Sequence, residues 1–385
     1  MRDRFLKVPA GYAARWLSDA ADCALVERWT SDSPEATVYH ASSYVEFARE
    51  QNGYADLLWL TRAGNPVLGI PVYPAGAVHM RTGYSGVMFA RGPRDAPLRR
   101  GVTALMALLD ANACLGFEVL QCAQAPAYDD PAYLTSLEFL LASHRLHGPC
   151  LYSRVLDVER LTSGSGTSTH AKSLMTRLTA GPDTSSELLL EHGMAPYEAE
   201  LRNQIRQAIR HGLRVTCALP STEAEITNAY SEFTPLHRES WERTGMVPHP
   251  VEYWTGLARA VVAGGGRDMV VCARDGDGVP LAAVTCHLHG DRALYCAGAS
   301  SERGLAARAN PLCLHAAIQA CRQLGVRHFE LGRFDAQESS RKELAITRYK
   351  AQFGGGLVRI VGFRTQPSIL AVVRRCARRL LGAQP

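Results

Sequence analysis

The sequence predicts an α/β (α+β) protein of two domains, each a mixed, largely antiparallel sheet flanked by helices. Three observations predict this class. The chain has 385 residues, more than a single hydrophobic core usually serves. Short apolar runs divided by glycine and aspartate alternate with longer segments of helical periodicity. The same order of elements also occurs twice along the chain, at a nearly constant offset.

The clearest series of strands lies in the second half. Its three apolar runs are divided by Asp-Gly-Asp-Gly and by Gly-Asp, which are typical hairpin turns because glycine and aspartate tolerate positive φ. We therefore predict an antiparallel meander. Its strands are Met269–Ala273, Leu281–His289 and Ala293–Ala297.

A helix is predicted directly after this meander, in "NPLCLHAAIQACRQLGV". Asn310 is the expected N-cap, Pro311 suits the first helical position, and Gly325 marks the end. The short strand "HFELG" follows. This gives the order meander, helix, strand.

The first half repeats this order in "ADLLWLTRAGNPVLGIPVYP", a helix ending near Gly116, and "EVLQC". Arg62-Ala63-Gly64 corresponds to Arg274-Asp275-Gly276, and Leu115-Gly116 to Leu324-Gly325. Two landmarks at nearly equal offset indicate a duplication, with domains at 1–150 and 151–385. Chance similarity of two ordinary α+β units is the alternative.

The charge is uneven along the chain. The net charge is +5, yet the segment from Arg341 to the end holds ten basic residues and one acid, Glu343. This segment is expected to end in a basic carboxy-terminal helix, which either meets an anionic partner or is simply solvated.

The composition also bears on location and metal binding. No run approaches the ~18 apolar residues of a membrane helix, and the amino-terminal residues lack the pattern of a secretory signal. We therefore expect a cytoplasmic protein without stable membrane insertion. Eleven scattered cysteines form no Cys-x-x-Cys pair, and His287 and His289 have no evident third ligand. No metal site is predicted, and no pattern predicts an oligomeric state.

A strongly amphipathic helix is predicted at 196–212. Its apolar face carries Leu201 and Ile205, and the arginines at 202, 206 and 210 recur every four residues beside that face. Such a stripe is either a solvated flank or a clamp for phosphate or carboxylate, which suits the planar guanidinium fork.

One lysine stands out. The chain has four lysines among its 42 basic residues, and Lys350 lies in "ITRYKAQFGGG", between Tyr349 and Phe353. A surface lysine flanked by core aromatics is one interpretation. The other is a compact ammonium required for chemistry, because 38 of the 42 basic residues are arginine.

Taken together, "LRNQIRQAIRHGLRV", "LHRESWERTG", the meander ending in "YCAGAS", "NPLCLHAAIQACRQLGVRHFELG" and "RYKAQFGGG" resemble the Fem-type transferases of the GNAT acyltransferase superfamily. The resemblance covers roughly residues 195–360. It implies two tandem GNAT-like domains. It also implies transfer of an aminoacyl group from aminoacyl-tRNA to a small-molecule amine, in a cell-wall precursor or a specialised metabolite. Aminoacyl-tRNA is then the co-substrate, and no other cofactor is expected.

The resemblance assigns roles to named residues. Lys350 is the expected catalytic cation facing the reacting carbonyl, and Asp335, after the "FELGRF" strand, is a candidate base, although most such aspartates only form turns. The remaining candidates fall into two groups. Those expected to bind tRNA or the donor are Arg348, Tyr349, Phe353, Arg303 and Arg308, and those expected to bind the acceptor are Arg202, Arg206, Tyr84, Trp241 and Tyr295.

Two alternatives remain at this point. An acyl-CoA N-acyltransferase would need a glycine-rich pyrophosphate loop before the helix, and "SSERGLAARANP" has only one glycine, Gly304. A non-enzymatic nucleic-acid-binding or scaffold protein would keep the fold without using Lys350.

Overall fold

The computed structural model describes residues 6–33, 35–74, 79–81, 86–90, 95–119, 131–144, 146, 151–158, 194–335, 341–365, 369 and 373. The chain forms two compact units, one of residues 1–151 with 359–385 and the other of residues 152–358. The return of the carboxy-terminal segment to the first unit corrects the predicted domain 151–385. Its physical cause is strand pairing, since Phe363 and Arg364 add to the first unit's sheet. The predicted basic helix lies outside the described residues.

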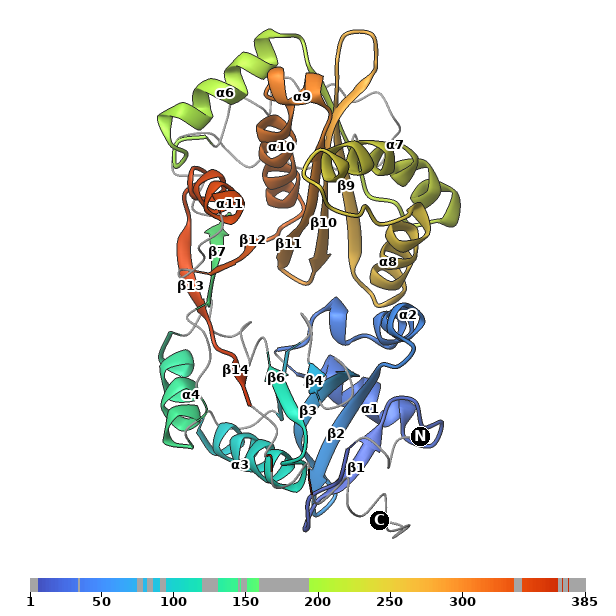
Figure 1. Ribbon diagram of the computed structural model, residues 1–385, viewed down its shortest axis with the longest axis vertical. Helices are drawn as coiled ribbons and strands as arrows, with labels where there is room; N and C mark the ends of the chain where they lie inside the picture. The colour runs from blue at the N-terminus through green and yellow to red at the C-terminus, as the bar shows by residue number, and fades with distance from the viewer. Residues whose placement is uncertain are drawn as a thin grey trace. The chain divides into compact units, whose positions relative to one another are not determined.

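The first unit has helices on both faces of one sheet (Figure 1). Its described strands run in the order β1-β2-β3-β4-β6-β14, and β5 pairs with β3. The elements are β1 (Ala13–Trp16), α1 (Cys23–Ser31), η2 (Val38–His40), α2 (Ser42–Asn52), β2 (Asp56–Arg62), β3 (Asn65–Pro74), β4 (His79–Arg81), β5 (Met88–Phe89), α3 (Asp95–Ala111), β6 (Gly116–Val119), α4 (Pro131–Ser143) and β14 (Phe363–Arg364).

The second unit is built in the same way, and its described strands run in the order β13-β7-β12-β11-β10-β9-β8. The three neighbouring pairs in the β8-β9-β10-β11 part are all antiparallel. The elements are β7 (Leu151–Asp157), α6 (Ala199–Arg210), β8 (Arg214–Ala218), α7 (Glu223–Glu242), α8 (Val251–Ala263), β9 (Arg267–Arg274), β10 (Pro280–His289), β11 (Arg292–Ser300), α9 (Glu302–Ala306), α10 (Ala309–Gln323), β12 (His328–Asp335), α11 (Arg341–Ala351) and β13 (Gly356–Ile360).

The two units repeat one arrangement. In the first, β4 pairs in parallel with β6 across helix α3. In the second, β11 pairs in parallel with β12 across helix α10. The predicted fold class, two units with a mixed, largely antiparallel sheet flanked by helices, is confirmed.

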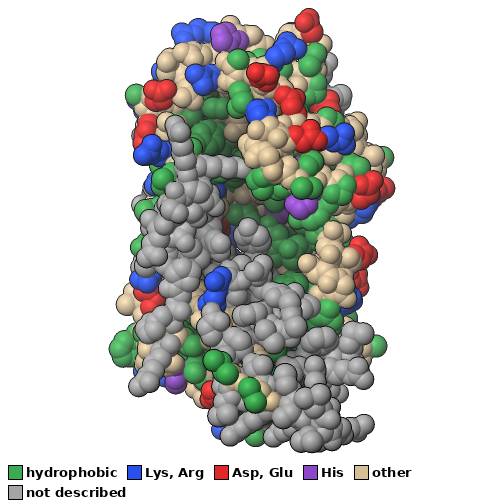
Figure 2. Space-filling model, in the orientation of Figure 1, with side chains coloured by type: hydrophobic (Ala, Val, Ile, Leu, Met, Phe, Trp, Pro, Cys, Tyr) green, Lys and Arg blue, Asp and Glu red, His purple; other side chains and the backbone are tan. Residues whose placement is uncertain are grey.

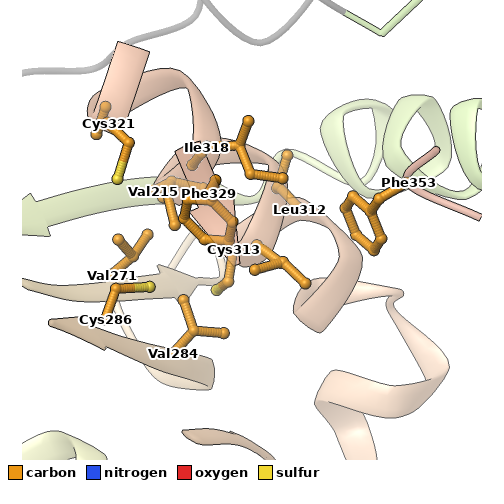
Figure 3. Packing of buried hydrophobic residues seen from close by; sticks show 14 of the residues in the cluster. Val215, Val271, Val284, Cys286, Leu312, Cys313, Ile318, Cys321, Phe329 and Phe353 are labelled. Carbon is orange, nitrogen blue, oxygen red and sulfur yellow. The ribbon is translucent and has the colours of Figure 1, made fainter. Parts of the chain in front are cut away.

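Alternation along the strands separates two layers in the second unit. Met269, Val271 and Val284 face the core shared with α6 and α10, which also holds the buried Cys286, Cys313 and Cys321 (Figure 3). These cysteines therefore act as small apolar side chains, as their scatter in the sequence indicates.

The start of α10 differs from the prediction. The helix begins at Ala309, and Arg308, with φ 57°, occupies the N-cap in place of Asn310. Asn310 is therefore helical, and its amide group is free to serve another element. The end of α10 agrees better with the prediction, because Gly325 has φ 75° just after the helix.

The opposite face of the sheet carries a buried polar group beneath α7. The Tyr230 hydroxyl donates to both carboxylate oxygens of Asp268, at 3.1 and 3.0 Å. The Nε2 atom of His287 lies 3.5 Å from the same carboxylate. Burial raises the pKa of Asp268 to about 7 and lowers that of His287 to about 4.

This carboxyl group should make stability depend on pH. Because its pKa is raised in the folded state, the folded chain holds the proton more tightly, and stability is lost as pH rises towards and through 7. The free energy of unfolding of the native protein, compared with that of Asp268→Asn, should fall by about 2–3 kcal/mol between pH 5 and pH 8. Urea unfolding of both proteins at the two pH values measures this. A constant difference between them would contradict the assignment.

Candidate functional site

Strand β11 is unusual for a strand inside a sheet. It lies between β10 and β12, yet all five residues of Leu294–Gly298 are only half-buried. Cys286 pairs with Tyr295 and Thr285 with Ala297, so Cys296 forms a bulge. Among the described residues, the parallel pairing with β12 covers only Arg292–Leu294. Solvent therefore reaches the middle of the sheet beside this bulge, a position at which bulges often border active sites.

The side chain of Lys350 reaches this part of the sheet from α11. Its Nζ atom lies 6.0 Å from the centroid of the Tyr295 ring on β11. A Cβ atom at Gly332 on β12 would come within 3.2 Å of the same Nζ. The ammonium group therefore lies against both strands, and Gly332, with φ 85°, leaves room for it where another residue would be strained.

The position of Lys350 changes its protonation. Burial lowers its pKa to about 8, while the negative charge of Glu330 acts in the opposite direction. Among the described residues, no carboxylate lies within ion-pair distance of Nζ. At neutral pH the group is thus mainly an ammonium, and no carboxylate of the described part of the chain is in direct contact with it.

Tyr349 connects α11 to the first turn of α10. Asn310 Nδ2 donates to the Tyr349 hydroxyl at 3.2 Å, and the Oδ1 atom of Asn310 is buried without a hydrogen-bond partner among the described residues. A Cβ atom at Gly298 would lie 3.2 Å from that oxygen and 2.2 Å from the Tyr295 hydroxyl. Tyr295, Asn310, Tyr349 and Lys350 thus meet at the bulge.

Phe353 does not belong to the exposed part of this site, contrary to the prediction. Its side chain is 0% exposed and packs edge-on against Tyr197, with ring centroids 5.2 Å apart. Figure 3 shows it among the core residues, beside Leu312. A ring that is buried on all sides cannot stack on a nucleotide base, so Phe353 anchors the end of α11 instead.

Most of the predicted arginines lie elsewhere on the second unit. Arg202 donates to the carbonyls of Tyr197 and Ala195 before α6. It therefore stabilises the start of its own helix, and its guanidinium is not free for the acceptor substrate, contrary to the prediction. Arg303 pairs with Asp275 at 2.7 Å. The side chains of Arg206, Arg308 and Arg348 are exposed.

The other predicted residues are also accounted for. Trp241 is half-buried on α7, where its ring contacts those of His237 and His249 at centroid distances of 4.5 and 5.3 Å. Asp335 is the last residue of β12, and its side chain is outside what the structure describes, as is the whole of Tyr84. The described residues contain no group of three or more metal-binding side chains.

Sequence reasoning missed Gly332 and Asn310. Gly332 interrupts the strand "HFELGRF", and a glycine inside a strand often marks the close approach of another group. That signal was available. Asn310 gave no such signal, because it was a good N-cap candidate by residue type.

Residues 197–351, which include β11, β12 and most of α11, match the family model of the acetyltransferase (GNAT) domain. The second unit is therefore similar to a GNAT domain. No curated protein sequence matches the chain.

Solved structures extend the GNAT comparison to nearly the whole chain. FemX is similar with a TM-score of 0.57 at 12% identity, over 93% of this chain and 98% of FemX. The C-terminal domain of a protein assigned as a lysylphosphatidylglycerol synthetase from Agrobacterium fabrum gives 0.52 at 14%, over 93% and 97%. The resemblance to Fem-type GNAT proteins is thereby confirmed for the fold, and with the family model it supports a GNAT-fold acyltransferase. No helix among the described residues is both long and apolar enough to span a bilayer.

The environment of Lys350 can be measured directly. Reductive methylation with ¹³C labels the four lysines and the α-amino group, and we expect one lysine resonance to titrate near pH 8 because burial disfavours the charged form. The Lys350→Arg variant should lack this resonance. Titration of all labelled lysines above pH 10 would place Nζ in bulk water and contradict the described site.

Proposed function

We propose that this GNAT-fold protein transfers an aminoacyl group from aminoacyl-tRNA to a small-molecule amine and so forms an amide bond. The observation that carries the proposal is the ammonium of Lys350, held against the bulged strand β11 and half-shielded from water. We further propose that the acceptor belongs to a cell-wall precursor or a specialised metabolite, and that the reaction takes place in the cytoplasm, where charged tRNA is found.

The chemistry needs a cation at this point. The acceptor nitrogen attacks the ester carbonyl carbon, a C–N bond forms, and the carbonyl oxygen becomes negative. The C–O bond to the ribose then breaks, and the departing ribose oxygen takes the proton that the amine loses. A preorganised ammonium in a partly dry site stabilises the negative oxygen between these steps. Lys350 suits this role because no carboxylate of the residues that the structure describes neutralises its charge by direct contact.

Arginine would not serve equally well at this position. The Nζ atom fits beside Gly332 as a compact group, at 3.2 Å from the position of an added Cβ. A guanidinium is wider and planar. This offers a reason for a lysine at this position in a chain whose basic residues are mostly arginine.

Three exposed arginines, at positions 206, 308 and 348, are candidate contacts to tRNA phosphates. On the face drawn in Figure 2, basic and acidic side chains of the described residues are interspersed rather than gathered into one patch. We therefore expect few strong phosphate contacts from that face, and a moderate dependence of tRNA binding on salt.

The second candidate function, acyl transfer from acyl-CoA, is favoured by the description of the matched family as an acetyltransferase domain. The loop after β11 is less suited to it. The Ser301 N–H donates to Leu281, the Glu302 N–H to Glu239 at 2.7 Å, and the Gly304 N–H to the Ser301 hydroxyl at 3.0 Å. These N–H groups are therefore not available to a pyrophosphate, which such loops normally bind through the backbone.

The two functions are separated by their donors. With a pool of charged tRNA and candidate amines, product formation should be abolished by prior treatment of the tRNA with ribonuclease. Calorimetry with acetyl-CoA should show no saturable binding. Product formation that survives ribonuclease, together with tight acetyl-CoA binding, would establish the second function instead.

Replacing Lys350 by alanine should lower turnover on the order of 10²-fold, the usual loss on removal of one oxyanion donor. Lys350→Arg should restore little of this, because the wider group does not fit beside Gly332. The exposed Lys7 in the other unit supplies a matched control, and Lys7→Ala should keep full activity. If Lys350→Ala turns over as fast as the native protein, the proposed role of Lys350 is wrong and only the similarity in fold remains.

A further inference from the structure

Glu330 is a half-buried carboxylate at the point where β11 and β12 stop pairing. It lies opposite Leu294, the last residue of β11 that pairs with β12 among the described residues. Its neighbours Phe329 and Leu331 are buried in the core shared with α10, so alternation directs the Glu330 side chain to the other face of the sheet.

A buried hydroxyl fixes this carboxylate in place. The Oγ atom of Ser153 on β7 donates to Glu330 Oε1 at 2.6 Å, and Ser153 is 0% exposed. A short bond to a charged acceptor from a fully buried donor holds the side chain in one orientation. Glu330 is thus preorganised while remaining partly open to solvent.

The charge of Glu330 also acts on Lys350. Glu330 lies two residues before Gly332 on β12, and the Lys350 Nζ atom lies 3.2 Å from the position of a Cβ at Gly332, so the two groups are near each other. The charge of Glu330 accordingly opposes the loss of the Lys350 proton. A molecule entering beside the β11 bulge therefore meets a cation from α11 and an anion from β12.

This arrangement of charges suits the α-ammonium group of an aminoacyl ester, a group that plain acyl donors lack. The α-ammonium is separated from the carbonyl carbon by one carbon atom. When the carbonyl oxygen approaches the Lys350 ammonium, the α-ammonium comes near the same positive charge and is repelled unless a carboxylate is close by. The site supplies such a carboxylate.

We propose that Glu330, oriented by Ser153, binds the α-ammonium group of the donor and so selects aminoacyl esters over donors with a blocked or absent amino group. This inference rests on the proposed function. It makes Glu330 a specificity-determining residue and Ser153 a positioning residue.

The test compares three forms of one tRNA preparation: uncharged, charged with a mixture of amino acids, and charged and then N-acetylated with acetic anhydride. Filter retention of 3′-end-labelled tRNA gives the affinity of the full-length protein for each form. The native protein should prefer the charged to the N-acetylated form by about tenfold or more, the usual strength of a charge-assisted hydrogen bond. Glu330→Gln should lose this preference, whereas Glu242→Gln, an exposed control on α7, should keep it.

Ser153→Ala is the second variant, and it keeps the proposal testable if Glu330→Gln does not fold. It leaves the carboxylate but removes its 2.6 Å donor, so the preference should fall several-fold while binding of uncharged tRNA stays unchanged. Circular dichroism identifies any variant that does not fold, and the remaining variant then decides.

The outcomes separate the two claims. If the native protein binds all three forms equally, the proposed function fails. If it prefers charged over uncharged tRNA but does not distinguish the N-acetylated form, or if folded Glu330→Gln keeps the full preference, the role of Glu330 is overturned while aminoacyl transfer stands.

Discussion

Strands β11 and β12 pair in parallel over three residues among those described, and beyond Leu294 a bulge at Cys296 turns β11 away from regular pairing. The rest of the site depends on this early end of the pairing. It leaves Leu294–Gly298 half-buried in the middle of a sheet, where a regular strand would be covered on both sides. Residues of α10, α11 and β12 then converge at one place that water can reach.

The convergence has a cost that other contacts offset. A lysine half-shielded from water loses hydration, which lowers its pKa to about 8. Placing it there requires a glycine at 332 and a firm anchor for α11. Phe353 supplies the anchor, because it is fully buried between Tyr197 and Tyr349 just after the helix ends. Fully burying such a ring is worth about 1.5–3 kcal/mol, enough to hold the last turn of α11 against the sheet.

Differences in burial explain why the two aromatic residues near the lysine have different roles. Tyr349 and Phe353 are separated by four positions, so both lie on one side of α11 and its continuation. Tyr349 is half-buried and its hydroxyl accepts a hydrogen bond from Asn310, whereas Phe353 has no polar atom and is entirely enclosed. Only the first is placed to border the site.

The sequence by itself determined the order of elements and the repeated unit, and it singled out Lys350 as one of four lysines among 42 basic residues. These depend on local properties: turn residues, apolar periodicity and residue choice are read over a few neighbouring positions. Only the tertiary structure decided that Phe353 is core, that Arg202 braces its own helix, that Asn310 serves Tyr349 and that the carboxy-terminal strand joins the first unit. Each of these depends on contacts between residues distant in sequence, and the free energy of burial and strand pairing that fixes such contacts belongs to the assembled fold rather than to any short segment.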